Sequence, residues 1–234
     1  MKIVLIGATG FIGSFILNEA LNRHHVVAAY VRDTNKLTGD ENILQKLEDI
    51  LEHKPKKEVH LHNIIPYKGD IFNVDNLAEV IGAHDAVISA YNPGWSNPDI
   101  YNLQIKGTRC IIDATKIGGV RRLLMVGGAG SLEVSPGVQF VDTPEFPAQY
   151  KQGALAMREV LNMLKKEHEL EWTFFSPAAK IEPGERTGIY RLGTDQLIVD
   201  ANGVSKISTQ DYAKAMIDEL EDPQHVKMRF TIGY

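Results

Sequence analysis

The stretch that decides the fold is MKIVLIGATGFIGSF, residues 1–15. Lys2–Ile6 is an apolar run of strand length. A glycine-rich segment at 7–10 interrupts it, and apolar residues then recur at helical spacing to about Arg23. This order predicts a buried strand, a tight turn and a helix. The stretch lacks the small-residue cleavage pattern of a signal peptide, so we interpret it as part of the fold.

Glycines occupy three positions of this turn in the pattern Gly-x-x-Gly-x-x-Gly. A pyrophosphate must reach backbone N–H groups at a helix N-terminus, and side chains there would block it. The alternative is a plain strand–helix turn with incidental glycines, but the pattern follows a strand and opens a helix, as a dinucleotide site requires. The predicted cofactor contacts in this turn are Gly7, Thr9, Gly10, Phe11, Ile12 and Gly13.

Apolar runs and helical patterns alternate along the rest of the chain. Further strands are predicted at Val26–Val31, Ile64–Tyr67, Asp85–Ala90, Arg122–Val126 and Trp172–Phe175. Helices are predicted at roughly 41–53, 73–82, 98–117 and 150–168, and a final helix is predicted to begin with a capping box formed by Ser208 and Asp211. The alternation indicates an α/β protein with a Rossmann-type, doubly wound parallel sheet.

The 234 residues are predicted to form one NAD(P)-binding domain, residues 1–234. Segment 177–207 is rich in proline and glycine and is expected to form a small C-terminal substrate lobe, with Arg186 on its surface. Segment 127–149 is a long loop of a kind that is usually functional or disordered.

Composition excludes several classes of partner. The net charge of −5 gives no reason to expect nucleic acid or an anionic membrane surface, and no apolar run approaches the roughly 20 residues of a bilayer span. The single cysteine, Cys110, permits no internal disulfide, and the pair His60 and His62 is too few ligands for a catalytic metal. We expect a cytoplasmic monomer or homodimer without a metal.

The end of the second predicted strand distinguishes the two nicotinamide dinucleotides. An acidic residue there binds the ribose 2′-hydroxyl, whereas a basic one accommodates a 2′-phosphate. Val31 takes the acidic position, and Arg32 follows it with a planar fork of donors. NADP(H) is therefore the predicted preference. NAD(H) is the alternative, with Asp33 binding the ribose.

Two further strands end in candidate contacts, because ligands bind at the carboxyl ends of strands in open α/β sheets. Asp70 follows the third strand and is a candidate to accept a hydrogen bond from the adenine amino group, or else a turn carboxylate. Ser89, Ala90 and Tyr91 follow the fourth strand.

Together, GATGFIG at 7–13, Val31-Arg32-Asp33, Gly69-Asp70, DAVIS at 85–89 and Ser176-Pro177 resemble the atypical short-chain dehydrogenase/reductase group. The chain is most similar to its NmrA-like and NAD(P)H–flavin-reductase or biliverdin-reductase-B-like members, which are often labelled NAD-dependent epimerases. The resemblance covers essentially the whole chain. It implies a bound NAD(P) across the glycine turn, Arg32, Asp70 and 89–91, with the nicotinamide near Ser176, Pro177 and Ala178.

The chain departs from the wider superfamily at the catalytic position. Catalytic members use Tyr-x-x-x-Lys on one helix, where the lysine lowers the pKa of the tyrosine. Here Tyr150 begins the expected helix, position 154 is alanine, and Lys151 lies on another face. The nearest hydroxyl after the fifth strand is Ser131. Tyr150 and Ser131 are the candidate catalytic residues, with helix-start packing as the other role for Tyr150.

These departures favour an NAD(P)H-dependent oxidoreductase that reduces a flavin, quinone or similar planar small molecule. Such a reaction needs orientation and a stacking pocket rather than a strong general base. The candidates to stack are Tyr91, Trp95, Phe140 and Phe146, although loop packing is the commoner role of such residues. The alternatives are a non-catalytic NADP-binding redox sensor, as NmrA-like proteins are thought to be, and a sugar-nucleotide epimerase or dehydratase.

Overall fold

The computed structural model describes residues 1–38 and 63–234. Its centre is an eight-stranded sheet in the order β10-β12-β8-β5-β4-β1-β2-β3, in which only β10 is antiparallel to its neighbour. The predicted Rossmann-type fold is confirmed, while the predicted helix at 41–53 lies outside the described residues. The strands of the sheet are β1 (Lys2–Ile6), β2 (Val26–Val31), β3 (Ile64–Lys68), β4 (Ala86–Ser89), β5 (Arg122–Val126), β8 (Glu171–Ser176), β10 (Arg191–Gly193) and β12 (Met228–Gly233).

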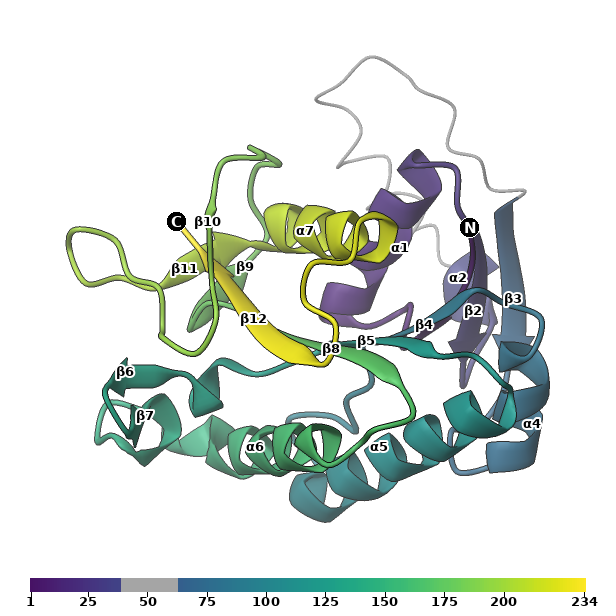
Figure 1. Ribbon diagram of the computed structural model, residues 1–234, viewed down its shortest axis with the longest axis horizontal. Coiled ribbons are helices and arrows are strands. Elements are labelled where there is room, and N and C mark those ends of the chain that lie inside the picture. The colour runs from purple at the N-terminus through teal and green to yellow at the C-terminus, as the bar shows by residue number, and fades with distance from the viewer. Residues whose placement is uncertain (39–62) are drawn as a thin grey trace.

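Helices cover both faces of this sheet (Figure 1). One face carries α1 (Phe11–Asn22) and α7 (Thr209–Glu221); the other carries α4 (Val74–Ile81), α5 (Ile100–Ile117) and α6 (Lys151–Lys165). The short helix α2 (Asn35–Thr38) follows β2. Because successive strand side chains point to opposite faces, Leu5 packs in the core under α1 and α7, whereas Val4 packs in the core under α4, α5 and α6.

The strand β12 has no counterpart among the predicted strands. It lies between β8 and β10, and all of its residues except Met228 are buried. The strand could not be predicted from the sequence, because Arg229 and Thr231, which are buried in the structure, interrupt the apolar pattern. The buried Arg229 guanidinium donates to the carbonyl and hydroxyl oxygens of Ser131 at 2.9 and 3.0 Å, and the Thr231 hydroxyl donates to the Ser176 carbonyl at 3.0 Å.

The loop predicted at 127–149 contains short ordered elements. These are the 3₁₀ turns η2 (Ala129–Ser131), η3 (Phe140–Asp142) and η4 (Ala148–Tyr150), and a hairpin of β6 (Glu133–Ser135) and β7 (Val138–Gln139). The segment predicted as a lobe, 177–207, is divided between two sheets. Its strand β9 (Lys180–Glu182) pairs with β11 (Lys206–Ser208), whereas its strand β10 extends the main sheet.

The capping box predicted for α7 forms only in part. Ser208 Oγ accepts from the Asp211 backbone N–H at 3.0 Å, as predicted. The Asp211 carboxylate does not reach back to the cap. It accepts instead from the Gly188 N–H at 2.8 Å and from the Thr187 hydroxyl at 2.6 Å. That part of the prediction is wrong because the carboxylate is occupied by donors from a loop distant in sequence.

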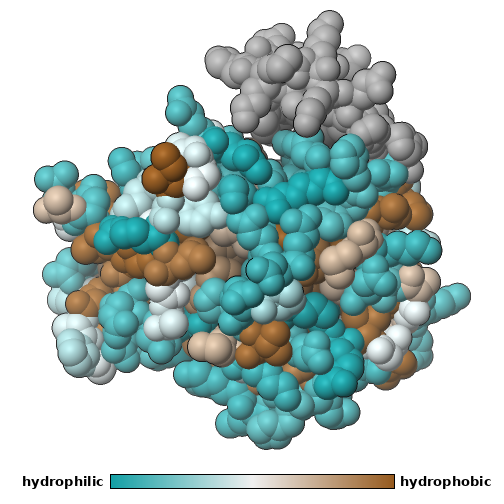
Figure 2. Space-filling model, turned by 45° about the horizontal axis from the view of Figure 1, so that its top comes forward, coloured by the Kyte–Doolittle hydropathy of each residue, from teal (hydrophilic) through white to brown (hydrophobic). Residues whose placement is uncertain are grey.

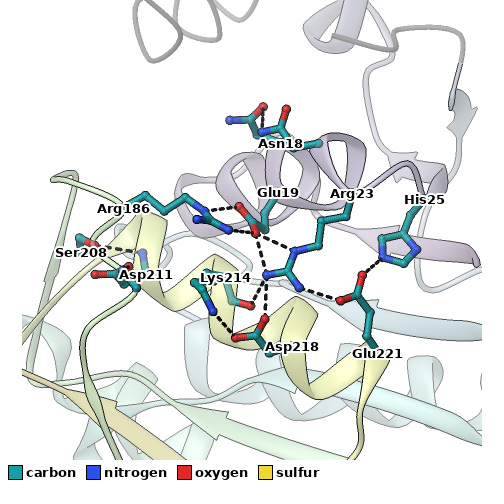
Figure 3. Close-up of polar contacts among 12 residues, drawn as sticks. Asn18, Glu19, Arg23, His25, Arg186, Ser208, Asp211, Lys214, Asp218 and Glu221 are labelled. Atoms are coloured by element: carbon teal, nitrogen blue, oxygen red, sulfur yellow. Dashed lines mark hydrogen bonds and ion pairs between the residues drawn. The ribbon is translucent and has the colours of Figure 1, made fainter. Parts of the chain in front are cut away.

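A network of charged side chains joins α1, α7 and the loop before β10 (Figure 3). Arg186 lies at the surface, as expected, with a side chain 39% exposed, and it also makes two hydrogen bonds to Glu19 of α1, at 2.9 and 2.7 Å. Arg23 bonds the same carboxylate at 2.8 Å and pairs with Asp218 and Glu221 of α7. Burial raises the pKa of Glu19, but the two arginines outweigh it and hold that pKa below its usual value.

The surface that surrounds this framework is mixed in polarity. Figure 2 shows apolar side chains gathered in several separate patches among hydrophilic ones. Among the exposed apolar residues, Ile189 is 81% exposed and Leu192 of the edge strand β10 is 50% exposed.

Candidate functional site

The turn between β1 and α1 has a backbone that only glycine fits. Gly7 has a φ of +81°, in the left-handed region that favours glycine. A Cβ atom at Gly7 would lie 2.7 Å from the Ala90 carbonyl oxygen, and one at Gly13 would lie 2.1 Å from the Gly7 carbonyl oxygen. The turn is therefore wedged between its own helix and the segment that follows β4.

The N-terminus of α1 presents unpaired backbone donors. Gly10 is its N-cap, with no side-chain hydrogen bond, and the first turn has no acidic residue. Within the described residues, the N–H groups of Phe11, Ile12 and Gly13 have no hydrogen-bond acceptor. Free N–H groups and the positive end of the helix dipole attract an anion. The turn therefore fits a dinucleotide diphosphate.

The segment after β4 lies beside this turn, where the strand order reverses between β1 and β4. Ser89 is buried and its Oγ accepts from the Tyr91 N–H at 3.4 Å. The Tyr91 hydroxyl donates to the Leu103 carbonyl at 3.2 Å, and its ring fills the space left by the missing side chain of Gly107. Burial raises the pKa of Tyr91 to about 12, so this phenol is a packing group that stays protonated.

Two predicted contacts follow β2 and β3 at the same edge of the sheet. Arg32 is exposed and makes no ion pair or hydrogen bond with any described residue, so its guanidinium is available to a ligand. One oxygen of the exposed Asp70 carboxylate accepts from the Phe72 N–H at 3.1 Å, which is the turn role that the sequence allowed. Its other oxygen has no partner within the described parts of the chain.

Ser176 is the last residue of β8, Pro177 and Ala178 follow it, and all three are buried. The Ser176 carbonyl accepts from Thr231, but its hydroxyl has no partner in the described residues. A buried hydroxyl without a partner is uncommon in folded proteins. If the nicotinamide lies here as predicted, only backbone groups and the small side chains of Ser176, Pro177 and Ala178 are available to contact it.

The two predicted catalytic hydroxyls are not joined. Ser131 is 2% exposed, and its Oγ accepts from the guanidinium of Arg229 at 3.0 Å. Arg229 is held in turn by Asp195. Tyr150 is 42% exposed, and its hydroxyl bonds neither Ser131 nor any lysine of the described chain. The structure therefore places no proton relay of the Tyr-Lys-Ser kind at this position.

The other three aromatic candidates, Trp95, Phe140 and Phe146, divide into two kinds. Phe140 and Phe146 are partly buried and pack edge to face, with ring centroids 4.9 Å apart, which is loop packing. Trp95 is 53% exposed and meets Tyr150 edge to face at 5.2 Å. The sequence analysis missed Gly153, whose open position in α6 admits the Trp95 ring. A glycine inside a predicted helix was the available signal.

In residues 1–38 and 63–234, no three histidine, cysteine, aspartate or glutamate side chains are grouped as a metal site would require, while His60 and His62 lie outside these ranges. None of the helices there has the length and apolar character that a bilayer span needs.

Comparison with known proteins places this geometry in a family. A family model described as NAD(P)H-binding matches residues 7–223. The YwnB protein of Bacillus subtilis (strain 168) is 40% identical over 99% of this chain and 98% of its own length.

Two solved structures are also similar along the whole chain. A "putative epimerase" from Bacteroides thetaiotaomicron is 49% identical, with a TM-score of 0.83 over 100% of this chain and 96% of that one. A "putative NADH-flavin reductase" from Streptococcus pneumoniae TIGR4 is 32% identical, with a TM-score of 0.78 over 100% and 99%. The glycine turn, the reversal of strand order and these similarities agree: the chain belongs to the NAD(P)H-binding family, whose cofactor is a nicotinamide dinucleotide.

Proposed function

We propose that this protein is a cytoplasmic, NADPH-dependent oxidoreductase that reduces a planar conjugated acceptor such as a flavin or a quinone. The observation that carries the proposal is the uncapped N-terminus of α1 behind a turn that has no room for a side chain at Gly7 or Gly13. Backbone N–H groups of Phe11, Ile12 and Gly13 would hold the diphosphate. The guanidinium of Arg32, which has no ion pair or hydrogen bond within the described residues, would hold the 2′-phosphate.

The absence of a joined catalytic pair supports this class of reaction. Bound NADPH would supply a hydride, and the acceptor would take it together with a proton from water, so that it gains two electrons and two protons in all. The protein's own part is to bind, orient and shield the two ligands. Ser131 is occupied by Arg229, and position 154 offers alanine in place of lysine, so none of the described residues is placed to activate Tyr150 as an acid.

The similar S. pneumoniae protein, named as an NADH-flavin reductase, supports the same choice of acceptor. An epimerase needs a pair of groups that moves a proton on and off the sugar, and the described site lacks the Tyr-x-x-x-Lys arrangement for that. The sensor alternative shares the cofactor site and differs only in turnover.

Turnover is tested by mixing the purified protein with NADPH and FMN, FAD or menadione while nicotinamide absorbance is followed. We expect NADPH to be consumed with at least one acceptor, and Tyr150→Phe to retain kcat within about tenfold, because no tyrosine acid is needed. Tight NADP binding without consumption for any acceptor would contradict the proposal and favour the sensor. A loss of about 100-fold or more in Tyr150→Phe would restore a tyrosine acid.

A further inference from the structure

We propose that Trp95 and Tyr150, here called the aromatic corner, form the wall on which the acceptor stacks, and that the acceptor is a flat conjugated ring with carbonyl oxygens on its edge. This inference rests on the proposed function and assigns the acceptor to particular side chains. It starts from an unusual pairing: two large aromatic side chains that touch each other at 5.2 Å and are nevertheless 53% and 42% exposed.

The Trp95 ring is held in place by its surroundings. A Cβ atom at Gly153 would lie 2.6 Å from Cζ3 of Trp95, so the hydrocarbon edge of the indole rests directly on the backbone of α6. The loop that carries Trp95 is tied by its own hydrogen bonds. Asn92 Oδ1 accepts from the Gly94 N–H at 2.7 Å, and the Asn97 N–H donates to the Gly94 carbonyl at 3.0 Å. A ring fixed in this way loses little conformational entropy when a ligand stacks on it.

The polar atoms of both rings are available for hydrogen bonds to a ligand. Neither Nε1 of Trp95 nor Oη of Tyr150 has a hydrogen-bond partner in the part of the chain that the structure describes. Cζ3 lies on the opposite side of the indole from Nε1, so contact with α6 leaves the N–H directed away from the helix. The corner therefore offers apolar ring surface together with an N–H and an O–H donor, a combination that suits a flat ring with acceptor oxygens on its rim.

The position of the corner agrees with this role. Trp95 follows β4, and Tyr150 is the N-cap of α6, which follows β5; these two strands are parallel neighbours. The loop of Trp95 begins at Ala90, whose carbonyl lies against Gly7 of the glycine turn. The corner thus stands at the same carboxyl edge of the sheet as the cofactor turn, where ligands of open α/β sheets bind.

The test measures binding without turnover. Oxidised FMN, lumiflavin or menadione is titrated into protein saturated with NADP⁺, with flavin fluorescence or calorimetry as the readout. Trp95→Leu removes the ring but keeps an apolar side chain, and we expect it to raise the acceptor Kd about five- to tenfold, the size of an aromatic stacking contribution. Trp95→Phe keeps a ring and is expected to stay within about threefold of the natural protein. The Kd for NADP⁺ should not change in either variant.

Ile189→Ala is the matched control, because Ile189 is an apolar side chain that is 81% exposed on another loop. It should leave acceptor binding unchanged. Equal acceptor Kd values for Trp95→Leu and the natural protein would overturn the corner. If NADPH is consumed but Trp95→Leu changes neither Kd nor KM, the corner fails while the proposed function stands. If flavin binding depends on Trp95 but NADPH is never consumed, the corner stands while the proposed function fails.

Discussion

Position 13 allows no side chain at all. A Cβ atom there would lie 2.1 Å from the Gly7 carbonyl oxygen, and that oxygen belongs to backbone that cannot move without shifting the turn. We expect Gly13→Ala to lower the free energy of unfolding by about 1–3 kcal/mol, as overpacking does in a tight site. It should also weaken nicotinamide dinucleotide binding, because α1 and its free N–H groups move. Thermal unfolding and calorimetric titration measure the two effects.

Gly82→Ala is the matched control for that change. Gly82 ends α4 with a φ of −60°, and a Cβ atom there would meet its nearest neighbour at 3.4 Å, an ordinary contact. Its stability should stay within about 0.5 kcal/mol of the natural protein. Similar behaviour of the two variants would mean that the turn is looser than the structure shows.

Arg32 decides which dinucleotide is preferred, if the proposed contact with the 2′-phosphate is correct. We expect Arg32→Glu to weaken NADPH binding by about 1–3 kcal/mol, the size of a lost charge-assisted hydrogen bond, and to affect NADH much less. Titration with both dinucleotides measures the difference. Arg121→Glu is the control, since Arg121 is an arginine with a 70% exposed side chain just before β5. Equal losses for NADPH and NADH in Arg32→Glu would reject the assignment.

The Glu19 carboxylate joins α1 to the loop before β10, and Arg23 links that carboxylate to α7. Glu19 is 5% exposed and receives both arms of Arg186 as well as Arg23. We expect Arg186→Met to lower the free energy of unfolding by about 1–3 kcal/mol, less than for a wholly buried pair, because Arg186 is partly exposed and Arg23 still neutralises Glu19. Urea unfolding monitored by circular dichroism measures this loss.

Lys180→Met provides the comparison for this element. Lys180 and Glu182 form an ion pair at 3.0 Å with side chains 64% and 50% exposed, and such pairs contribute roughly 0–1 kcal/mol. If Arg186→Met costs no more than Lys180→Met, the contact with Glu19 does not fasten the loop to α1.

The whole molecule should lose stability in acid because of the same network. Burial raises the pKa values of Glu19 and Asp218, yet hydrogen bonds and opposite charges hold both below their ordinary values of 4.5 and 3.8. A carboxylate with a lowered pKa in the folded state stabilises the protein above its unfolded pKa. That stabilisation is lost as the pH falls below about 4.5 and through the folded values.

Urea unfolding between about pH 7 and about pH 3 tests this prediction. Glu19→Gln removes one of the titrating groups, so its free energy of unfolding should fall less steeply with decreasing pH than that of the natural protein. Glu182→Gln, in the exposed pair with Lys180, should leave the slope unchanged. A slope in Glu19→Gln as steep as in the natural protein would show that other carboxylates govern acid unfolding.

Local sequence determined the frame of this molecule and the place of its cofactor turn. Short-range periodicity, together with glycines that the backbone requires, predicts the order of strand, glycine turn and helix at residues 1–22. Short-range periodicity also predicts the alternation of strands and helices that builds the parallel sheet. These features depend on neighbours a few residues away, which is why they could be predicted.

Tertiary structure alone decided the state of the chemical groups. Ser131 is occupied by Arg229, 98 residues away, and Glu19 by Arg186, 167 residues away. Trp95 comes to rest on Gly153 because α6 packs beside the loop after β4. A side chain's partners, exposure and pKa depend on which distant segments fold against it, and the local sequence pattern does not predict those contacts.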